Sequence, residues 1–85
     1  MLKKHPTIES VKSILIQINP SIESWLTDDN VDLFEISALD SLLSVTFIQQ
    51  LEKEFEFTFD YTDLKVHNFQ NLQSIVRLLT GKYGL

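Results

Sequence analysis

Apolar residues recur at intervals of three and four along several stretches of this chain, and this is the spacing of one face of an α-helix. In residues 8–18 the recurring side chains are Ile8, Val11, Leu15 and Ile18. Pro6 and Thr7 suit the start of a helix here, and Asn19-Pro20 suits its end. The pattern therefore predicts a first helix over residues 8–18.

A second helix is predicted to begin at Asp40, whose carboxylate can accept hydrogen bonds from free backbone N–H groups and favours the positive end of the helix. At about 100° per residue, one broad face of this helix is apolar and is assigned to the core. The residues on that face are Val45, Phe47, Ile48, Leu51 and Phe55. Leu42 projects away from the face and Leu43 lies at its edge, which predicts a small exposed apolar patch beside the helix start.

Residues 55–61 alternate between aromatic and polar side chains, as β-strands do. The chain has no second alternating run to pair with this one, and a lone strand is unstable. We therefore expect an extended connection that buries alternate aromatic rings, followed by a short helix that is capped by Asp60 and runs to about Lys65.

The last helix is predicted to be capped by Asn71 and to end at Gly81 in the left-handed conformation. Its inner face is formed by Leu72, Ile75, Val76 and Leu79. With 85 residues the chain is long enough for one domain with one core, and too short for a deep catalytic cleft as well. The expected fold is all-α: a small four-helix bundle of three main helices, one short helix and a long first loop, forming a single domain over residues 1–85 whose core lies within about residues 8–80.

The loop expected over residues 19–40 is polar and acidic, yet large apolar side chains are spread through it. They are Ile22, Trp25, Leu26, Val31, Leu33 and Phe34. We expect a loop of this composition to fold down over the core. Long connections without regular structure are often functional, so the loop is also a place to look for a site.

Charge and composition narrow the classes of partner. From Glu23 to Asp63 there are eleven acids and one base, Lys53, a formal charge of −10 in a chain whose net charge is −5. Nucleic acid is an unsuitable partner, because binding to phosphates needs a basic face. An acidic face suits partners with basic docking faces, although an acidic surface also serves solubility, and charge alone does not choose between these.

The sequence predicts neither a membrane protein nor a secreted one. No apolar run is long enough to span a bilayer, and residues 1–6 do not resemble a signal peptide. We expect a cytoplasmic protein, or a piece of a cytosolic assembly. The chain has no cysteine, which excludes disulfides, thiolate metal sites and cysteine nucleophiles.

No catalytic or metal-binding motif is present. His5 and His67 lack companion residues, and a Gly-x-Ser-x-Gly turn is absent. With only Gly81 and Gly84 there is no glycine-rich loop for phosphates. Residues 27–32 are acidic but lack the glycine and the spaced glutamate of a calcium loop. We therefore expect a protein that is not an enzyme and has no catalytic or metal-ligating residues.

The segment from Asp32 to Leu42 resembles the acyl and peptidyl carrier protein family. In that family an Asp-Ser-Leu triplet follows the long first loop and opens the second helix, as Asp40-Ser41-Leu42 does here after the apolar pair Leu33-Phe34. The spacing of Phe47, Leu51 and Phe55 and the sequence of residues 68–72 are also similar to the family's, so that the likeness covers roughly residues 8–80.

The resemblance implies that Ser41 is the attachment site of a covalent 4'-phosphopantetheine arm, with Asp40 orienting the helix start. A phosphopantetheinyl transferase would move the arm from coenzyme A onto the serine hydroxyl, which is exposed in the first turn of a helix where free N–H groups favour a phosphate. The thiol of the arm would hold acyl or aminoacyl intermediates as thioesters. The residues expected to bind partners are Leu42, Leu43, Val45 and Glu52.

The expected partners are that transferase and synthase, ligase or acyltransferase enzymes with basic docking faces, acting on a monomeric carrier that is not bound to a membrane. The chain departs from the family in three ways: Ala38 replaces a frequent glycine, Glu56 follows Phe55 where glycine is usual, and Leu43 and Thr46 replace acids of fatty-acid carriers. The last departure favours polyketide or nonribosomal peptide synthesis. A carrier of fatty-acid synthesis, or an unmodified interaction module with the same fold, remains the alternative.

Overall fold

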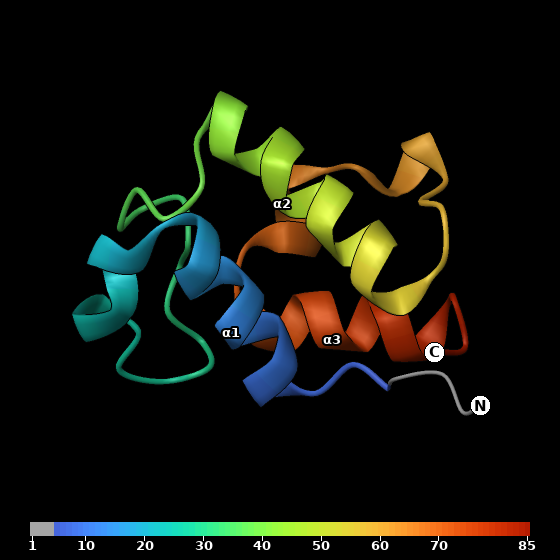
Figure 1. Cartoon of the computed structure of the whole chain (residues 1–85), viewed down its shortest axis with the longest axis horizontal. Helices are drawn as coiled ribbons and strands as arrows, with labels where there is room; N and C mark the ends of the chain where they lie inside the picture. The colour runs from blue at the N-terminus through green and yellow to red at the C-terminus, as the bar shows by residue number, and fades with distance from the viewer. Residues whose placement is uncertain (1–4) are drawn as a thin grey trace.

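The computed structural model describes residues 5–85, and over these residues the chain is all-α, as predicted. The three main helices are α1 (Ile8–Ile18), α2 (Ser41–Phe55) and α3 (Leu72–Gly81). Three short 3-10 helices lie between them: η1 (Pro20–Trp25), η2 (Tyr61–Asp63) and η3 (Val66–Phe69). Figure 1 shows α2 crossing above α1 and α3, with the first loop at one end of the molecule and the C-terminus near the other. The short helix expected up to Lys65 is η2, which ends two residues earlier, while η1 and η3 were not foreseen.

The predicted N-terminal caps are present. The side chain of Thr7 accepts a hydrogen bond from the Ser10 N–H at 3.1 Å, and the Ser10 hydroxyl oxygen accepts one from the Thr7 N–H at 2.8 Å. At α3 the Asn71 side chain accepts from the Ser74 N–H at 2.7 Å. These local bonds satisfy N–H groups that have no partner in the helix itself, which is why short polar residues mark the helix starts.

The prediction for Gly81 is right about where α3 ends and wrong about the conformation of the glycine. Gly81 lies within the last turn of α3, and Lys82, the capping residue, keeps a right-handed helical conformation. The positive φ comes later, at Gly84 with φ 64°. The Lys82 N–H still donates to the Leu78 carbonyl, so the helical hydrogen bonding outlasts the glycine and the chain turns only afterwards.

At the end of α2 a glutamate occupies the position that glycine usually takes. Glu56 has φ 54° and ψ 57°, and its N–H donates to the Glu52 carbonyl. This left-handed conformation brings the Cβ of any L-residue close to the backbone, at a cost of roughly 1–2 kcal/mol. The helix therefore ends at Phe55 without a following glycine, and Glu56 carries local strain.

Replacing Glu56 by glycine should relieve that strain. We expect Glu56→Gly to raise the free energy of unfolding by about 0.5–1 kcal/mol, because the gain is partly offset by the greater freedom of glycine in the unfolded chain. Urea denaturation would measure the change. Glu56→Gln, which removes the charge but keeps the Cβ, should have little effect, and an equal gain in both variants would assign the effect to charge instead.

The core is formed by side chains from all three α-helices and from the connections between them. The buried apolar residues are Val11, Ile14, Leu15, Ile22, Leu26, Leu33, Ala38, Leu39, Phe47, Leu51, Phe55, Phe59, Phe69, Leu72, Ile75 and Leu79. The first loop folds over this core as predicted, with Ile22, Leu26 and Leu33 buried. Within residues 5–85 no helix is long and apolar enough to cross a membrane.

Three placements predicted for the core need correction. Val45 is 52% exposed, because it lies two residues before Phe47 and so about 200° away from it around the helix. Trp25 is 62% exposed, and the next residue, Leu26, is the one that points inward. In the alternating stretch Phe55 and Phe59 are buried, but the alternation fails at Tyr61, which is 82% exposed.

Candidate functional site

The start of α2 is built by Asp40. One oxygen of its carboxylate accepts hydrogen bonds from the Leu42 N–H at 3.0 Å and from the Leu43 N–H at 2.8 Å. Its backbone carbonyl accepts from the Ser44 N–H at 2.8 Å, which closes the first turn. Asp40 therefore fixes the direction of the helix start, as the sequence predicts.

Ser41 is the first residue of α2, and it is exposed. Within the described part of the chain, neither its hydroxyl nor its N–H has a hydrogen-bond partner. A helix N-terminus with a free N–H and the positive end of the helix dipole favours a phosphate group. A phosphodiester on the Ser41 oxygen therefore fits this position, both in space and in charge.

The geometry also shows what the site lacks. No side chain among residues 5–85 is hydrogen-bonded to the Ser41 hydroxyl. Among the same residues no group of three His, Asp or Glu side chains lies close enough to hold a metal ion. The arrangement offers an accessible hydroxyl at the start of a helix.

The loop before α2 is held by a compact set of backbone hydrogen bonds. The Leu33 carbonyl accepts from the Ala38 N–H at 2.8 Å and the Leu39 N–H at 3.1 Å. Ser37 takes a positive φ of 60° to allow this turn. Ala38 itself is fully buried and has no positive φ, so alanine is accommodated there without the conformational freedom of glycine.

Asp32 anchors the same loop to Gln70, in the connection between η3 and α3. One carboxylate oxygen accepts from the N–H groups of Phe34 at 2.9 Å and Glu35 at 3.0 Å, and the other accepts from the Gln70 side-chain amide at 3.0 Å. The Gln70 amide and then these backbone N–H groups lower the pKa of Asp32 below its ordinary value. The Leu33 N–H also donates to the Gln70 carbonyl at 2.7 Å. Ser41 is thus presented by a fixed loop.

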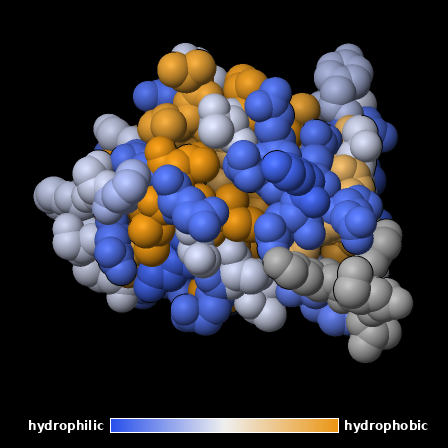
Figure 2. Space-filling model, in the orientation of Figure 1, coloured by the Kyte–Doolittle hydropathy of each residue, from blue (hydrophilic) through white to orange (hydrophobic). Residues whose placement is uncertain are grey.

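An apolar patch lies beside Ser41. Leu42 is 74% exposed, Val45 is half-exposed and Leu43 is half-buried. Figure 2 shows apolar surface over this N-terminal end of α2, next to strongly polar surface. Leu42 and Val45, three residues apart on α2, therefore lie on one side of the helix near Ser41, and Leu43 lies on the other side of Leu42.

Glu52, the fourth residue expected to bind partners, lies elsewhere. It belongs to the C-terminal half of α2, and its carboxylate accepts a hydrogen bond from the Phe59 N–H at 2.8 Å. Its side chain is half-buried and holds the connection after α2 in place. The structure gives Glu52 an internal contact and separates it from the patch at the start of the helix.

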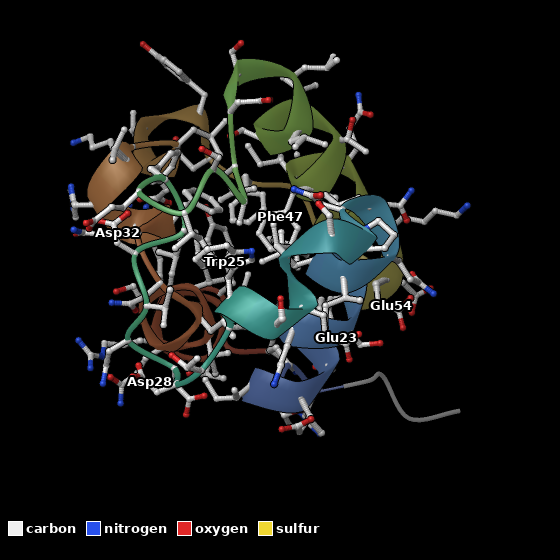
Figure 3. The ribbon with its side chains drawn as sticks, turned by 90° about the vertical axis from the view of Figure 1, so that its left-hand side faces the viewer. Glu23, Trp25, Asp28, Asp32, Phe47 and Glu54 are labelled. Atoms are coloured by element: carbon white, nitrogen blue, oxygen red, sulfur yellow. The ribbon has the colours of Figure 1, made fainter. Side chains whose placement is uncertain are left out.

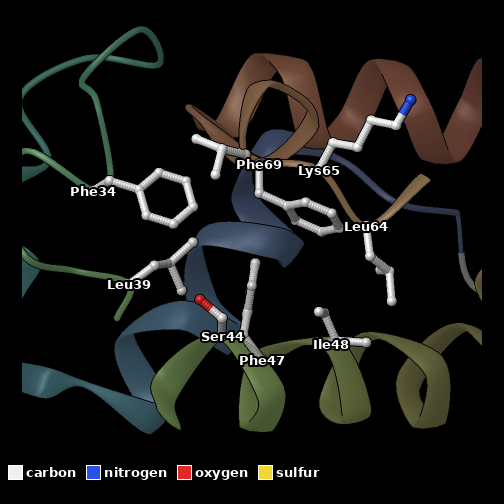
Figure 4. A pocket seen from close by; sticks show the side chains of 9 residues that line it. Phe34, Leu39, Ser44, Phe47, Ile48, Leu64, Lys65 and Phe69 are labelled. Atoms are coloured by element: carbon white, nitrogen blue, oxygen red, sulfur yellow. The ribbon is translucent and has the colours of Figure 1, made fainter. Parts of the chain in front are cut away.

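Beyond the patch, an apolar cavity of about 170 Å³ opens between α2 and the segment that joins η2 to η3. Figure 4 shows side chains from both sides converging on it. They are Phe34, Leu39, Ser44, Phe47, Ile48, Leu64, Lys65, Val66 and Phe69. Ser44, one helical turn after Ser41, supplies a hydroxyl to a wall that is otherwise mostly apolar. Sequence reasoning missed this cavity, because its walls come from three separate segments of the chain.

The acids of the first loop lie on the outside of the molecule. Figure 3 shows Glu23, Asp28 and Asp32 around the exposed Trp25. Asp28 accepts a hydrogen bond from the Asn30 N–H at 2.7 Å and so shapes a local turn. This face is acidic and lies apart from the start of α2.

Comparison with known proteins adds one finding. A family model described as a phosphopantetheine attachment site matches residues 21–79, a range that starts in η1, ends in α3 and includes Ser41. No curated protein and no solved structure gives a significant match.

Proposed function

This chain belongs to the family of domains with a phosphopantetheine attachment site, and we propose that Ser41 is its residue of attachment. As a member of that family it is a carrier domain, which bears a covalently attached 4'-phosphopantetheine. The observation that supports Ser41 is its exposed, unpartnered hydroxyl at the first residue of α2. Among the other serines of the matched range, Ser44 is half-buried in the cavity wall and Ser74 is half-buried in α3. Ser21, Ser24 and Ser37 are exposed, but none of them begins an α-helix.

Each residue at the helix start has a distinct role in this proposal. Asp40 occupies the N–H groups of Leu42 and Leu43 and leaves that of Ser41 free to face the phosphate. When attached, the arm supplies a terminal thiol, absent from this cysteine-free chain, that can hold cargo as a thioester. Activation of the Ser41 hydroxyl is assigned to the phosphopantetheinyl transferase, and the domain itself to a role without catalysis.

The partners follow from the surface around Ser41. Carrier domains of this family interact with phosphopantetheinyl transferases and with biosynthetic enzymes. We assign recognition here to the apolar patch centred on Leu42, with Leu43 and Val45 at its sides. The acidic surface of the first loop suits a basic docking face. The domain acts as a monomer in this proposal.

The proposed pathway is polyketide or nonribosomal peptide synthesis. Its support is local: an apolar Leu43 and a neutral Thr46 stand where fatty-acid carriers tend to have acids. The alternative, a carrier for fatty-acid synthesis, is favoured by the apolar cavity one turn from Ser41, which would accommodate a hydrocarbon chain. Mass analysis of the arm released from protein isolated from its own cells distinguishes the two.

The attachment itself has a direct test. The protein is incubated with coenzyme A, Mg²⁺ and a broad-specificity transferase, and its intact mass is measured. We expect the mass to increase by one phosphopantetheine in the wild type and in the control Ser24→Ala, which removes another exposed serine of the matched range, and to stay unchanged in Ser41→Ala. A wild type that is not modified, or a Ser41→Ala variant that still is, would overturn the proposal.

A further inference from the structure

The hydroxyl of Tyr83 joins the C-terminal end of the chain to both ends of η2. It accepts a hydrogen bond from the Asp60 N–H at 2.8 Å and donates one to the Asp63 carboxylate at 2.6 Å. The same carboxylate oxygen is 2.6 Å from the ammonium nitrogen of Lys82. Tyr83 thus bridges two groups that lie 23 and 20 residues before it in the sequence.

The ring of Tyr83 packs against other aromatic rings. Its centroid lies 5.2 Å from that of Phe57 and 5.5 Å from that of Phe59, the latter in an edge-to-face arrangement. Phe59 in turn packs edge-to-face on Phe69 at 5.6 Å, and Phe69 lines the apolar cavity. Such pairs are favourable beyond their buried area, so the ring is a stable support for the hydroxyl.

The groups that Tyr83 holds lie next to the cavity wall. Asp63 directly precedes Leu64, Lys65 and Val66, which form the wall opposite α2. The Asp63 carbonyl accepts from the Lys65 N–H at 2.9 Å and from the Asn68 side-chain amide at 2.8 Å. A displacement of Asp63 would therefore be transmitted to the whole wall.

We propose that Tyr83 is a positioning residue, whose hydroxyl holds η2 through Asp60 and Asp63 and so fixes the wall of the apolar cavity opposite α2. The link to cargo rests on the proposed attachment at Ser41, one turn from the cavity, whereas the positioning itself is a property of the unmodified domain. The bridge determines how far this wall opens and therefore what can enter from the side of the arm.

The protonation states agree with this geometry. Hydrogen bonds from Lys82 and then from Tyr83 lower the pKa of Asp63, so its carboxylate is charged near neutral pH. Burial and then the bond to Asp63 raise the pKa of Tyr83, so its hydroxyl keeps the proton that it donates. The hydrogen bond is therefore charge-assisted, the stronger kind.

Tyr83→Phe removes this hydroxyl and keeps the ring. Hydrogen exchange followed by mass spectrometry should show amides of residues 60–69 exchanging about tenfold faster, the effect of one lost charge-assisted hydrogen bond, while those of α1 keep their rates. The matched control is Tyr61→Phe, which removes the same atom from the exposed tyrosine and should exchange as the wild type does. Unchanged rates in residues 60–69, or equal acceleration in α1, would overturn the proposal.

A second measurement reports on the cavity rather than on stability. Xenon binds apolar cavities. Leu39, Ile48 and Leu64 line this cavity, so the changes that xenon causes in the chemical shifts of their methyl groups measure how much of the time it occupies the cavity. We expect a smaller response in Tyr83→Phe than in the wild type and Tyr61→Phe, because a displaced wall encloses the probe less of the time. An equal response in all three proteins would contradict the assigned role. Both measurements use the unmodified protein, so neither depends on attachment at Ser41.

Discussion

Phe47→Ala is expected to lower the free energy of unfolding by about 3–5 kcal/mol, through lost burial of the ring and the void that it leaves. Phe47 is fully buried on α2 and also lines the apolar cavity, so the new void would join an existing one. A domain of this size is stabilised by only about 4–13 kcal/mol in total. Thermal unfolding should therefore show a decrease in Tm of roughly 15 °C or more.

Val45→Ala is the matched control for this change. Val45 lies on the same helix, two residues before Phe47, but about half of it is exposed. Its truncation should lower the free energy of unfolding by less than about 1 kcal/mol. If urea denaturation gave the two variants similar stabilities, the assignment of Phe47 to the interior would be wrong, and with it the packing that supports the start of α2.

The starts of the helices could be predicted from the sequence because capping is local chemistry. Thr7, Asp40 and Asn71 each accept from N–H groups two or three residues ahead, so residue type and position are enough to find them. The position of Ser41 could be predicted for the same reason, because it directly follows such a capping residue. Its exposure follows from the same local geometry.

The ends of the helices were harder to predict because a left-handed residue is an outcome of the whole turn. Glycine is favoured there but not required: Glu56 takes the left-handed conformation after α2, while Gly81, the last residue of α3, does not. Burial was also predicted wrongly at Tyr61 in the aromatic stretch and at Trp25 in the first loop. An apolar residue at the end of a buried stretch can point outward when its neighbour fills the interior.

The cavity and the Tyr83 bridge lay beyond sequence reasoning for a different reason. Both depend on residues far apart in the chain: Asp60 is hydrogen-bonded to Tyr83, and Ser44 and Val66 line the same cavity. Hydrophobic periodicity shows which face of a helix is buried, but not which segment covers it. The family resemblance pointed to Ser41 and its neighbours, and gave no information on how the opposite wall is held.

Leu42→Ala is expected to slow phosphopantetheine loading without changing the fold. The Leu42 N–H donates to Asp40, and alanine keeps that N–H, so the cap and Ser41 stay in place. The lost side chain is 74% exposed in the free domain and would be buried against the transferase. Burial of a leucine is worth roughly 1.5–3 kcal/mol, so kcat/KM for loading should decrease about tenfold or more.

Gln50→Ala is the control for this prediction, since it truncates another exposed side chain of α2 away from the patch. It should be loaded at the wild-type rate, and both variants should unfold within about 0.5 kcal/mol of the wild type, as surface substitutions usually do. Higher salt should slow loading of all three proteins alike, because the acidic surface is unchanged in each. Should Leu42→Ala be loaded as fast as Gln50→Ala, the apolar patch would have no part in this encounter, and the acidic surface would have to account for recognition alone.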